Sequence, residues 1–190
     1  MKKQICIVIL LLVLTACGGP AGKLVKQYGG PKTLPDVIPA RSIVLLHPAS
    51  GEKLNVIYFY DGSYDKAALK KINQLFRDRR SNEVYKIDPE LIDFLVDIRT
   101  RLMLPPTVVF EILSGYRSAV TNGALARQSR QVAKESLHKF GWAVDFRISG
   151  VGGSAIAEIA KTMQRGGVSF YRGDNHVHID IGNIRTWAAR

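Results

Sequence analysis

Two short segments, far apart in this 190-residue chain, hold three of its four histidines. The segment SLHKFGWAVDF, residues 136–146, places His138 seven positions before Asp145. The segment HVHIDI near the C-terminus holds His176 and His178. Imidazole and carboxylate groups are ligands that zinc accepts, but the same side chains also occur on solvated polar faces. The residues alone leave both interpretations open.

The HVHIDI segment has the alternation of a β-strand. Successive side chains of a strand point to opposite faces, so His176, His178 and Asp180 are expected on one face and the aliphatic residues on the other. A histidine pair at this spacing can present metal ligands, and it is equally compatible with a polar surface. The fourth histidine, His47, has no such companion and is interpreted as a structural or surface residue.

The first 16 residues are predicted to be a lipoprotein signal peptide. Lys2 and Lys3 precede an apolar run that is too short to span a membrane as a mature helix. The sequence LTAC, which ends at Cys17, resembles the lipobox of bacterial lipoproteins; an ordinary secretory signal is the alternative. The lipobox implies acylation of Cys17, and Gly18 after it favours the outer membrane. The expected location is the cell envelope, with the folded part facing the periplasm.

Composition narrows the chemistry further. Because the only other cysteine, Cys6, lies in the signal peptide, the folded part has no thiol, and any metal must be held by His, Asp or Glu. The chain has 27 Lys and Arg against 16 Asp and Glu, a net charge of +11, which indicates an anionic partner. Nucleic acid is not expected outside the cytoplasm, and no recognition pattern for it is present. A carboxylate-rich cell wall or an acidic membrane surface fits better.

Helices and strands are expected in mixed order after residue 40. Apolar runs predict a β-hairpin over 42–47 and 53–60. Further helices are expected over 63–79, 88–102, within 119–135 and over 156–163, and further strands over 107–113, 142–148, 168–171 and 176–181. This order indicates an α+β fold in a single domain, residues 41–190, with a mostly antiparallel sheet flanked by helices. Residues 17–40, rich in Gly and Pro, are interpreted as a tether.

The first histidine segment resembles a known metallopeptidase motif. SLHKFGWAVD fits the pattern S-x-H-x-x-G-x-A-x-D of the zinc D-alanyl-D-alanine metallopeptidases. The order of SGYRS, the His–Asp motif and the last His-containing strand is similar as well. The similarity is closest to the murein endopeptidase K type (YcbK-like proteins) and covers nearly the whole domain. It implies a Hedgehog-like and D-Ala-D-Ala-peptidase-like fold and a Zn²⁺ cofactor.

The resemblance also implies a role for each site residue. The zinc ligands would be His138, Asp145 and His178. Arg117 would hold a substrate carboxylate or stabilise the developing oxyanion. His176 would be the general base, with Asp174 as the alternative, although the endopeptidase K type commonly has an apolar residue at the position of His176. Three further polar residues are expected to orient a ligand or to contact the substrate: Ser136, Asp180 and Tyr116.

These features together predict a zinc-dependent peptidoglycan hydrolase. The expected reaction is hydrolysis of an amide in the peptide crosslinks of murein, at crosslinks that end in meso-diaminopimelate. Two alternatives stay open: a D,D- or L,D-carboxypeptidase that acts on stem peptides, and a non-catalytic cell-wall-binding lipoprotein on the same scaffold. The expected partners are peptidoglycan and, through the lipid anchor, a membrane.

Overall fold

The computed structural model describes residues 38–129 and 132–188. The helices in these ranges are α1 (Lys66–Leu75), α2 (Pro89–Arg101), α3 (Ala119–Gln128) and α4 (Gly153–Thr162), with a short 3-10 helix, η1 (Leu137–Phe140). The strands are β1 (Arg41–His47), β2 (Glu52–Tyr60), β3 (Ser63–Tyr64), β4 (Val109–Ser114), β5 (Ala143–Ile148), β6 (Gly167–Tyr171), β7 (His176–Asp180) and β8 (Arg185–Ala188). The predicted signal peptide, the predicted lipidation site Cys17 and nearly all of the predicted tether lie outside the described residues.

All the strands of the described part form one sheet, in the order β3-β2-β1-β4-β5-β7-β6-β8. The pairs β1–β4 and β6–β8 are parallel, and the other neighbouring pairs are antiparallel. The prediction of an α+β fold with a mostly antiparallel sheet is therefore confirmed. The predicted hairpin is also present, as β1 and β2, which pair from Arg41–Phe59 to His47–Glu52.

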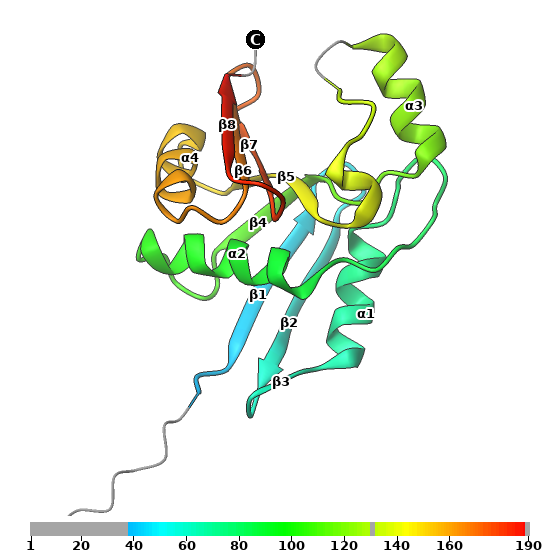
Figure 1. Cartoon of the computed structure of the whole chain (residues 1–190). Helices are drawn as coiled ribbons and strands as arrows, with labels where there is room; N and C mark the ends of the chain where they lie inside the picture. Colours follow the sequence, from blue (N-terminus) through cyan, green and yellow to red (C-terminus); the bar gives the residue numbers. More distant parts are fainter. Residues whose placement is uncertain (1–37, 130–131, 189–190) are drawn as a thin grey trace, which may run out of the picture. The chain divides into compact units, whose positions relative to one another are not determined.

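Three helices cover one face of this sheet. Helix α1 packs beside β2, α2 beside β1, and α4 beside β6 and β7 (Figure 1). Their apolar residues join the inward side chains of the strands in one hydrophobic core, which includes Phe94, Phe146, Val177 and Ile179. Because side chains alternate along a strand, the neighbours of these strand residues, Asp145 and His178 among them, lie on the opposite face. The sequence therefore separates a helix-covered core face from a polar face.

Local signals explain where the helices begin. Asp88 accepts a hydrogen bond from the backbone N–H of Glu90, and Pro89 occupies the first turn of α2. Helix α1 is shorter than predicted, because Ser63 and Tyr64 pair with β2 and Asp65 caps the helix instead. No helix in the described part of the chain is both long and apolar enough to cross a bilayer.

The C-terminal strand β8 was not predicted. It pairs in parallel with β6, from Gly167–Arg185 to Phe170–Ala188, at the edge of the sheet. Its sequence, RTWA, is short and has no apolar alternation. This strand places Trp187 beside His178 and Arg185 beside Asp180 on β7.

Candidate metal centre and active site

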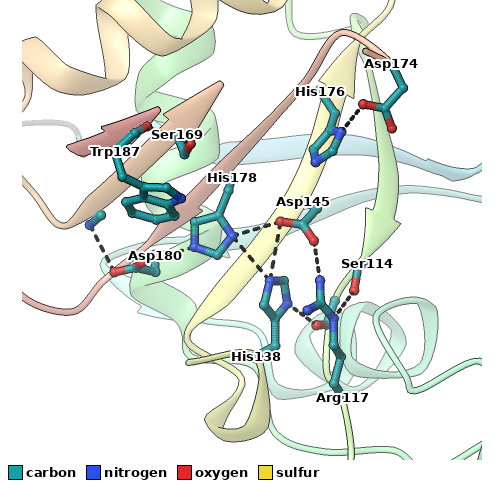
Figure 2. A network of polar contacts seen from close by, with 12 residues as sticks. Ser114, Arg117, His138, Asp145, Ser169, Asp174, His176, His178, Asp180 and Trp187 are labelled. Carbon is teal, nitrogen blue, oxygen red and sulfur yellow. Dashed lines mark hydrogen bonds and ion pairs between the residues drawn. The ribbon is translucent and has the colours of Figure 1, made fainter. Parts of the chain in front are cut away.

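Three elements bring the predicted ligands to one point on the polar face. His138 lies in η1, Asp145 on β5 and His178 on β7, and the last two are directly opposite each other in the antiparallel pair β5–β7. One ligand atom from each of the three residues lies within 4.8 Å of the others. Figure 2 shows the three side chains directed toward one another. All three residues are buried, so the cluster is largely shielded from solvent.

The spacing of these atoms fits a single small cation. His138 Nε2 lies 3.3 Å from His178 Nδ1 and 3.4 Å from Asp145 Oδ1, and His178 Nδ1 lies 2.8 Å from Asp145 Oδ1. Ligands held at about 2.0–2.1 Å from a tetrahedral zinc ion would be about 3.3 Å apart. Two of the three separations match this value. The third, between His178 Nδ1 and Asp145 Oδ1, is shorter because the imidazole and the carboxylate form a hydrogen bond. The donor set thus suits a metal with three protein ligands.

Each histidine is oriented by the nitrogen that faces away from the cluster. His138 Nδ1 donates to the carbonyl of Gly115 at 2.7 Å, which leaves Nε2 as the acceptor atom within the cluster. His178 Nε2 lies 3.1 Å from Asp180 Oδ2, which directs Nδ1 inward in the same way. These outer contacts select the ring nitrogens that a metal needs before any metal binds.

Asp180 is itself held rigidly. Its carboxylate is fully buried and accepts hydrogen bonds from the backbone N–H groups of Gly167 at 3.0 Å and Gly182 at 2.9 Å. Arg185 of β8 binds both of its oxygens, at 3.0 and 2.7 Å. A Cβ atom at Gly167 would lie 2.3 Å from Asp180 Oδ2, so only glycine fits beside this carboxylate. The structure places Asp180 as a support for His178, one of the two roles expected for it.

Arg117 supports the third ligand. Its Nη2 forms an ion pair with Asp145 Oδ2, the oxygen that faces away from the histidines, and its Nε donates to Ser114 Oγ at 2.8 Å. Its backbone N–H donates to the carbonyl of His138 at 3.1 Å. The SGYR loop after β4 therefore contacts two of the three ligands, through Gly115 and Arg117. The guanidinium lies at the cluster, where it can also meet a bound substrate.

The electrostatics keep the carboxylates of the site ionised. Burial alone would raise the pKa of Asp145, but His138, His178 and Arg117 outweigh it and hold that pKa well below its ordinary value. Asp180 behaves likewise: hydrogen bonds from His178 and the backbone outweigh burial and lower its pKa to about 2.

The two imidazoles differ in their titration. Burial lowers the pKa of His138 and so favours its neutral, metal-binding form. Burial also tends to lower the pKa of His178, but Asp145 and Asp180 outweigh burial and raise this pKa above its ordinary value. A metal that binds here must therefore compete with a proton on His178.

His176 lies at the edge of the same pocket with two partners of its own. Its Nδ1 lies 2.5 Å from Asp174 Oδ1, and its ring stacks on Tyr171 with centroids 4.3 Å apart and planes 8° apart. Tyr171 is the residue directly opposite it in the β6–β7 pair. With Nδ1 engaged by Asp174, Nε2 is the ring nitrogen left to exchange a proton with a bound molecule. Figure 2 shows His176 on the side of the cluster where Asp145 lies.

The cluster opens into a pocket of about 280 Å³. The ligands, Arg117, Ser136 and His176 line it, together with three residues that sequence reasoning missed: Tyr171, Arg185 and Trp187. The Trp187 ring lies 5.2 Å from the ring of His178 and is 37% exposed, so it forms an apolar wall beside the cluster. Tyr171 and Trp187 carry no local motif, and only the pairing of β6 with β7 and β8 reveals them.

Two other residues of interest lie apart from the cluster. Tyr116 points the other way: its hydroxyl donates to Glu83 Oε1 at 2.8 Å, and its ring stacks on Tyr85 at 4.7 Å. His47 is mostly buried and engages the turn after β1, with Nδ1 2.9 Å from Ser50 Oγ. The structure therefore does not bring either residue to the metal cluster.

Gly141 allows the segment between His138 and Asp145 to turn. Its φ of +67° lies in the left-handed region, and a Cβ atom there would lie 2.2 Å from the carbonyl oxygen of Lys86. Ala143, at the start of β5, is fully buried, so a larger side chain has no room. The small residues of the motif thus serve the sharp return from η1 into β5, which aligns the two ligands.

The chain resembles known peptidoglycan endopeptidases over nearly all of its described residues. Residues 37–187 match a family model described as peptidoglycan L,D-endopeptidase MepK. The chain is 42% identical over 138 residues to the probable peptidoglycan L,D-endopeptidase MepK of Haemophilus influenzae, which covers 73% of this chain and 74% of that protein. It is 40% identical over 147 residues to peptidoglycan L,D-endopeptidase MepK of Escherichia coli K12, and the match covers 77% of this chain and 80% of that protein. The predicted resemblance and the prediction of a peptidase are confirmed, and the chain belongs to the MepK endopeptidase family.

Proposed function

We propose that this protein is a zinc-dependent endopeptidase that hydrolyses L,D-amide bonds in the peptide crosslinks of peptidoglycan. The observation that carries the proposal is the convergence of His138, Asp145 and His178 in one pocket. In each of the three side chains, the atom that faces away from the cluster is held by a hydrogen bond or an ion pair. The bond type follows the names of the relatives from H. influenzae and E. coli. Zinc is the proposed metal because two imidazoles and one carboxylate form a set that is common in catalytic zinc sites.

The chain's own residues supply the remaining steps. A bound zinc ion would supply Lewis acidity and lower the pKa of a coordinated water to about 7. His176, held by Asp174 and Tyr171, would accept a proton through Nε2 and return it to the leaving amine. Arg117 would stabilise the negative charge that develops on the scissile carbonyl oxygen or hold a carboxylate of the substrate. Ser136 and Trp187 would shape the pocket around the peptide.

We further propose that the protein works at the cell envelope. The LTAC sequence before Gly18 supports acylation of Cys17, and residues 17–40 would then connect the lipid to the domain. The folded part would face the periplasm, where murein is within reach, from the outer membrane. The net charge of +11 suits a partner that carries free carboxylates.

One experiment tests metal and bond together. The protein is treated with chelator, its metal content is measured before and after zinc is restored, and purified sacculi are digested with each form. Mass spectrometry of the released muropeptides should show zinc-dependent loss of L,D-crosslinked dimers. His178→Ala should lose both zinc and activity, whereas His47→Gln, which removes a histidine outside the cluster, should keep its zinc. Intact crosslinks after digestion with fully zinc-loaded protein would contradict the proposal.

The same assay separates the alternatives. A D,D- or L,D-carboxypeptidase would shorten the stem peptides of monomers and leave crosslinked dimers unchanged. A non-catalytic wall-binding lipoprotein would bind sacculi equally well as wild type and as His178→Ala, and would release nothing. The precise arrangement of the outer hydrogen bonds argues against that second alternative, because wall binding alone does not require oriented imidazoles.

A further inference from the structure

A second cavity, of about 310 Å³, lies next to the metal pocket. It is bounded by the C-terminal end of α1, the end of β4 and the inner side of α3, and it shares Arg117 and Val132 with the metal pocket. Arg117 is thus the common wall between the metal cluster and this second space. The two spaces therefore meet at Arg117 and Val132, next to the metal cluster.

The lining of this cavity is apolar inside and cationic at its rim. Leu75, Ile112 and Leu125 supply aliphatic surface, and Arg77, Arg79 and Arg80 follow one another closely in the loop after α1. Such a lining suits a side chain with an aliphatic stem that ends in an anion, because each part then meets a surface of matching polarity.

Most of the charged side chains near the rim already have partners within the protein. Arg77 and Arg79 both form ion pairs with Glu52, so two guanidinium groups share one carboxylate. Arg77 Nη2 lies 2.9 Å from Glu52 Oε1. Asp78 is buried, and its carboxylate accepts hydrogen bonds from the backbone N–H groups of Ser118 and Arg80, both at 2.8 Å. Neither acid is therefore available to the rim.

Arg80 is the free cation of this rim. Its side chain is exposed and makes no hydrogen bond or ion pair with any other residue in the ranges that the structure describes. Its backbone, in contrast, is fixed by Asp78 Oδ1. A guanidinium on a fixed backbone at the mouth of a partly apolar cavity is well placed to bind a carboxylate in bidentate fashion.

We infer that this second cavity binds one arm of the crosslinked peptide, with a free carboxylate of that arm on Arg80. The inference rests on the proposed function and extends it, since an endopeptidase must hold peptide on both sides of the scissile bond. The metal pocket takes the amide and one arm, and the cavity beyond Arg117 takes the aliphatic side chain and carboxylate of the other. The ligand class is an acidic peptide with an aliphatic side chain.

Two synthetic crosslinked dimers test the assignment with zinc-loaded full-length protein. They share the scissile bond, but one has free carboxylates and the other has them as amides. Arg80→Ala should raise KM for the free-acid dimer about tenfold, as loss of a hydrogen bond to a charged group does, with little change in kcat. KM for the amidated dimer should not change. Arg80→Lys should restore part of the affinity and Arg80→Glu should weaken it further.

Arg101→Ala is the matched control, because it removes an exposed arginine from the end of α2, on the helix-covered face. It should leave both KM values unchanged, and the thermal unfolding of Arg80→Ala should match that of the wild type. Equal effects of Arg80→Ala on the two dimers, or none on either, would overturn the inference while the wild type still cleaves, so the proposed function would stand. Failure of the wild type to cleave either dimer would count against the proposed function itself.

Discussion

The carboxylate of Asp180 lies 3.1 Å from His178 Nε2, on the side of the ring that faces away from the metal cluster. The two residues are two positions apart on β7 and share one face of the strand, as the alternation of the sequence predicts. Asp180 thereby sets which nitrogen of His178 faces Asp145 and His138. The orientation of the His178 ring therefore depends on this contact.

Asp180→Asn should weaken zinc binding about 10- to 100-fold, which is typical when the outer partner of a histidine ligand is changed. The amide keeps the volume of the side chain but no longer holds the Nε2 proton by charge. Competition titration with a chromophoric chelator measures the affinity. Asp174→Asn is the control, because Asp174 contacts His176 and no ligand of the cluster. Similar affinities for the wild type and both variants would show that His178 is oriented by something else.

Arg117→Lys should lower kcat/KM about 100-fold while zinc remains bound. Lysine keeps the charge but has a single nitrogen, so it cannot reproduce the planar fork in which Arg117 uses Nε for Ser114 Oγ and Nη2 for Asp145 Oδ2. Arg147→Lys is a matched change on β5, where Arg147 pairs with Glu111 at 3.0 Å outside the metal pocket, and it should alter the rate less than about twofold. Steady-state kinetics on crosslinked muropeptides, with metal content measured in parallel, distinguishes the two. Equal losses in both variants would argue against a specific role for Arg117.

His176→Ala should reduce kcat about 10²- to 10⁴-fold without loss of zinc, as expected for removal of a general base. Tyr171→Phe keeps the stacked ring and should retain most activity, whereas Tyr171→Leu removes the stack and should cost about three- to tenfold in kcat. The loss from Tyr171→Leu should disappear when His176 is already Ala, because the tyrosine then has no ring to position. A loss of the same size in both backgrounds would mean that Tyr171 acts on the fold rather than through His176.

The sequence predicts the local part of this site and misses the nonlocal part, for physical reasons. Alternation in HVHIDI places His178 and Asp180 opposite Val177 and Ile179, because burial of the aliphatic pair fixes the register of the strand. Two-residue periodicity is a local property, so it is visible in one segment.

Residues contributed by neighbouring strands carry no such signal. Tyr171 faces His176 only because the turn between β6 and β7 has one particular length, and Trp187 reaches the pocket only because β8 pairs in parallel with β6. The convergence of His138 with Asp145 likewise requires the left-handed turn at Gly141. Of these relationships, only the convergence of His138 with Asp145 is expected from the sequence, and it follows from the family resemblance. The resemblance does not predict the pairing of β8 with β6.

Asp78 allows a test of stability against pH that is separate from the metal cluster. Its carboxylate is 2% exposed and joins the loop after α1 to the start of α3 through Ser118. Burial alone would raise its pKa, but hydrogen bonds from Thr121, Ser118 and the backbone of Arg80 outweigh burial and lower the pKa below its ordinary value of 3.8. The ionised form is therefore favoured by folding, so its contribution is complete above pH 3.8 and is lost as the pH falls below that value.

Asp78→Asn should lower the free energy of unfolding by about 1–3 kcal/mol at pH 6, because the amide cannot accept all of these hydrogen bonds. Urea denaturation of metal-free wild type and variant, repeated between pH 6 and pH 3, measures the difference. The difference in unfolding free energy between the wild type and Asp78→Asn should become smaller below pH 3.8, because only the wild type loses the stabilisation of an ionised Asp78 there. Subtraction removes the titration of the other groups, which both proteins share. A gap that stays constant over this range would mean that the Asp78 charge contributes nothing and that only the shape of the side chain matters.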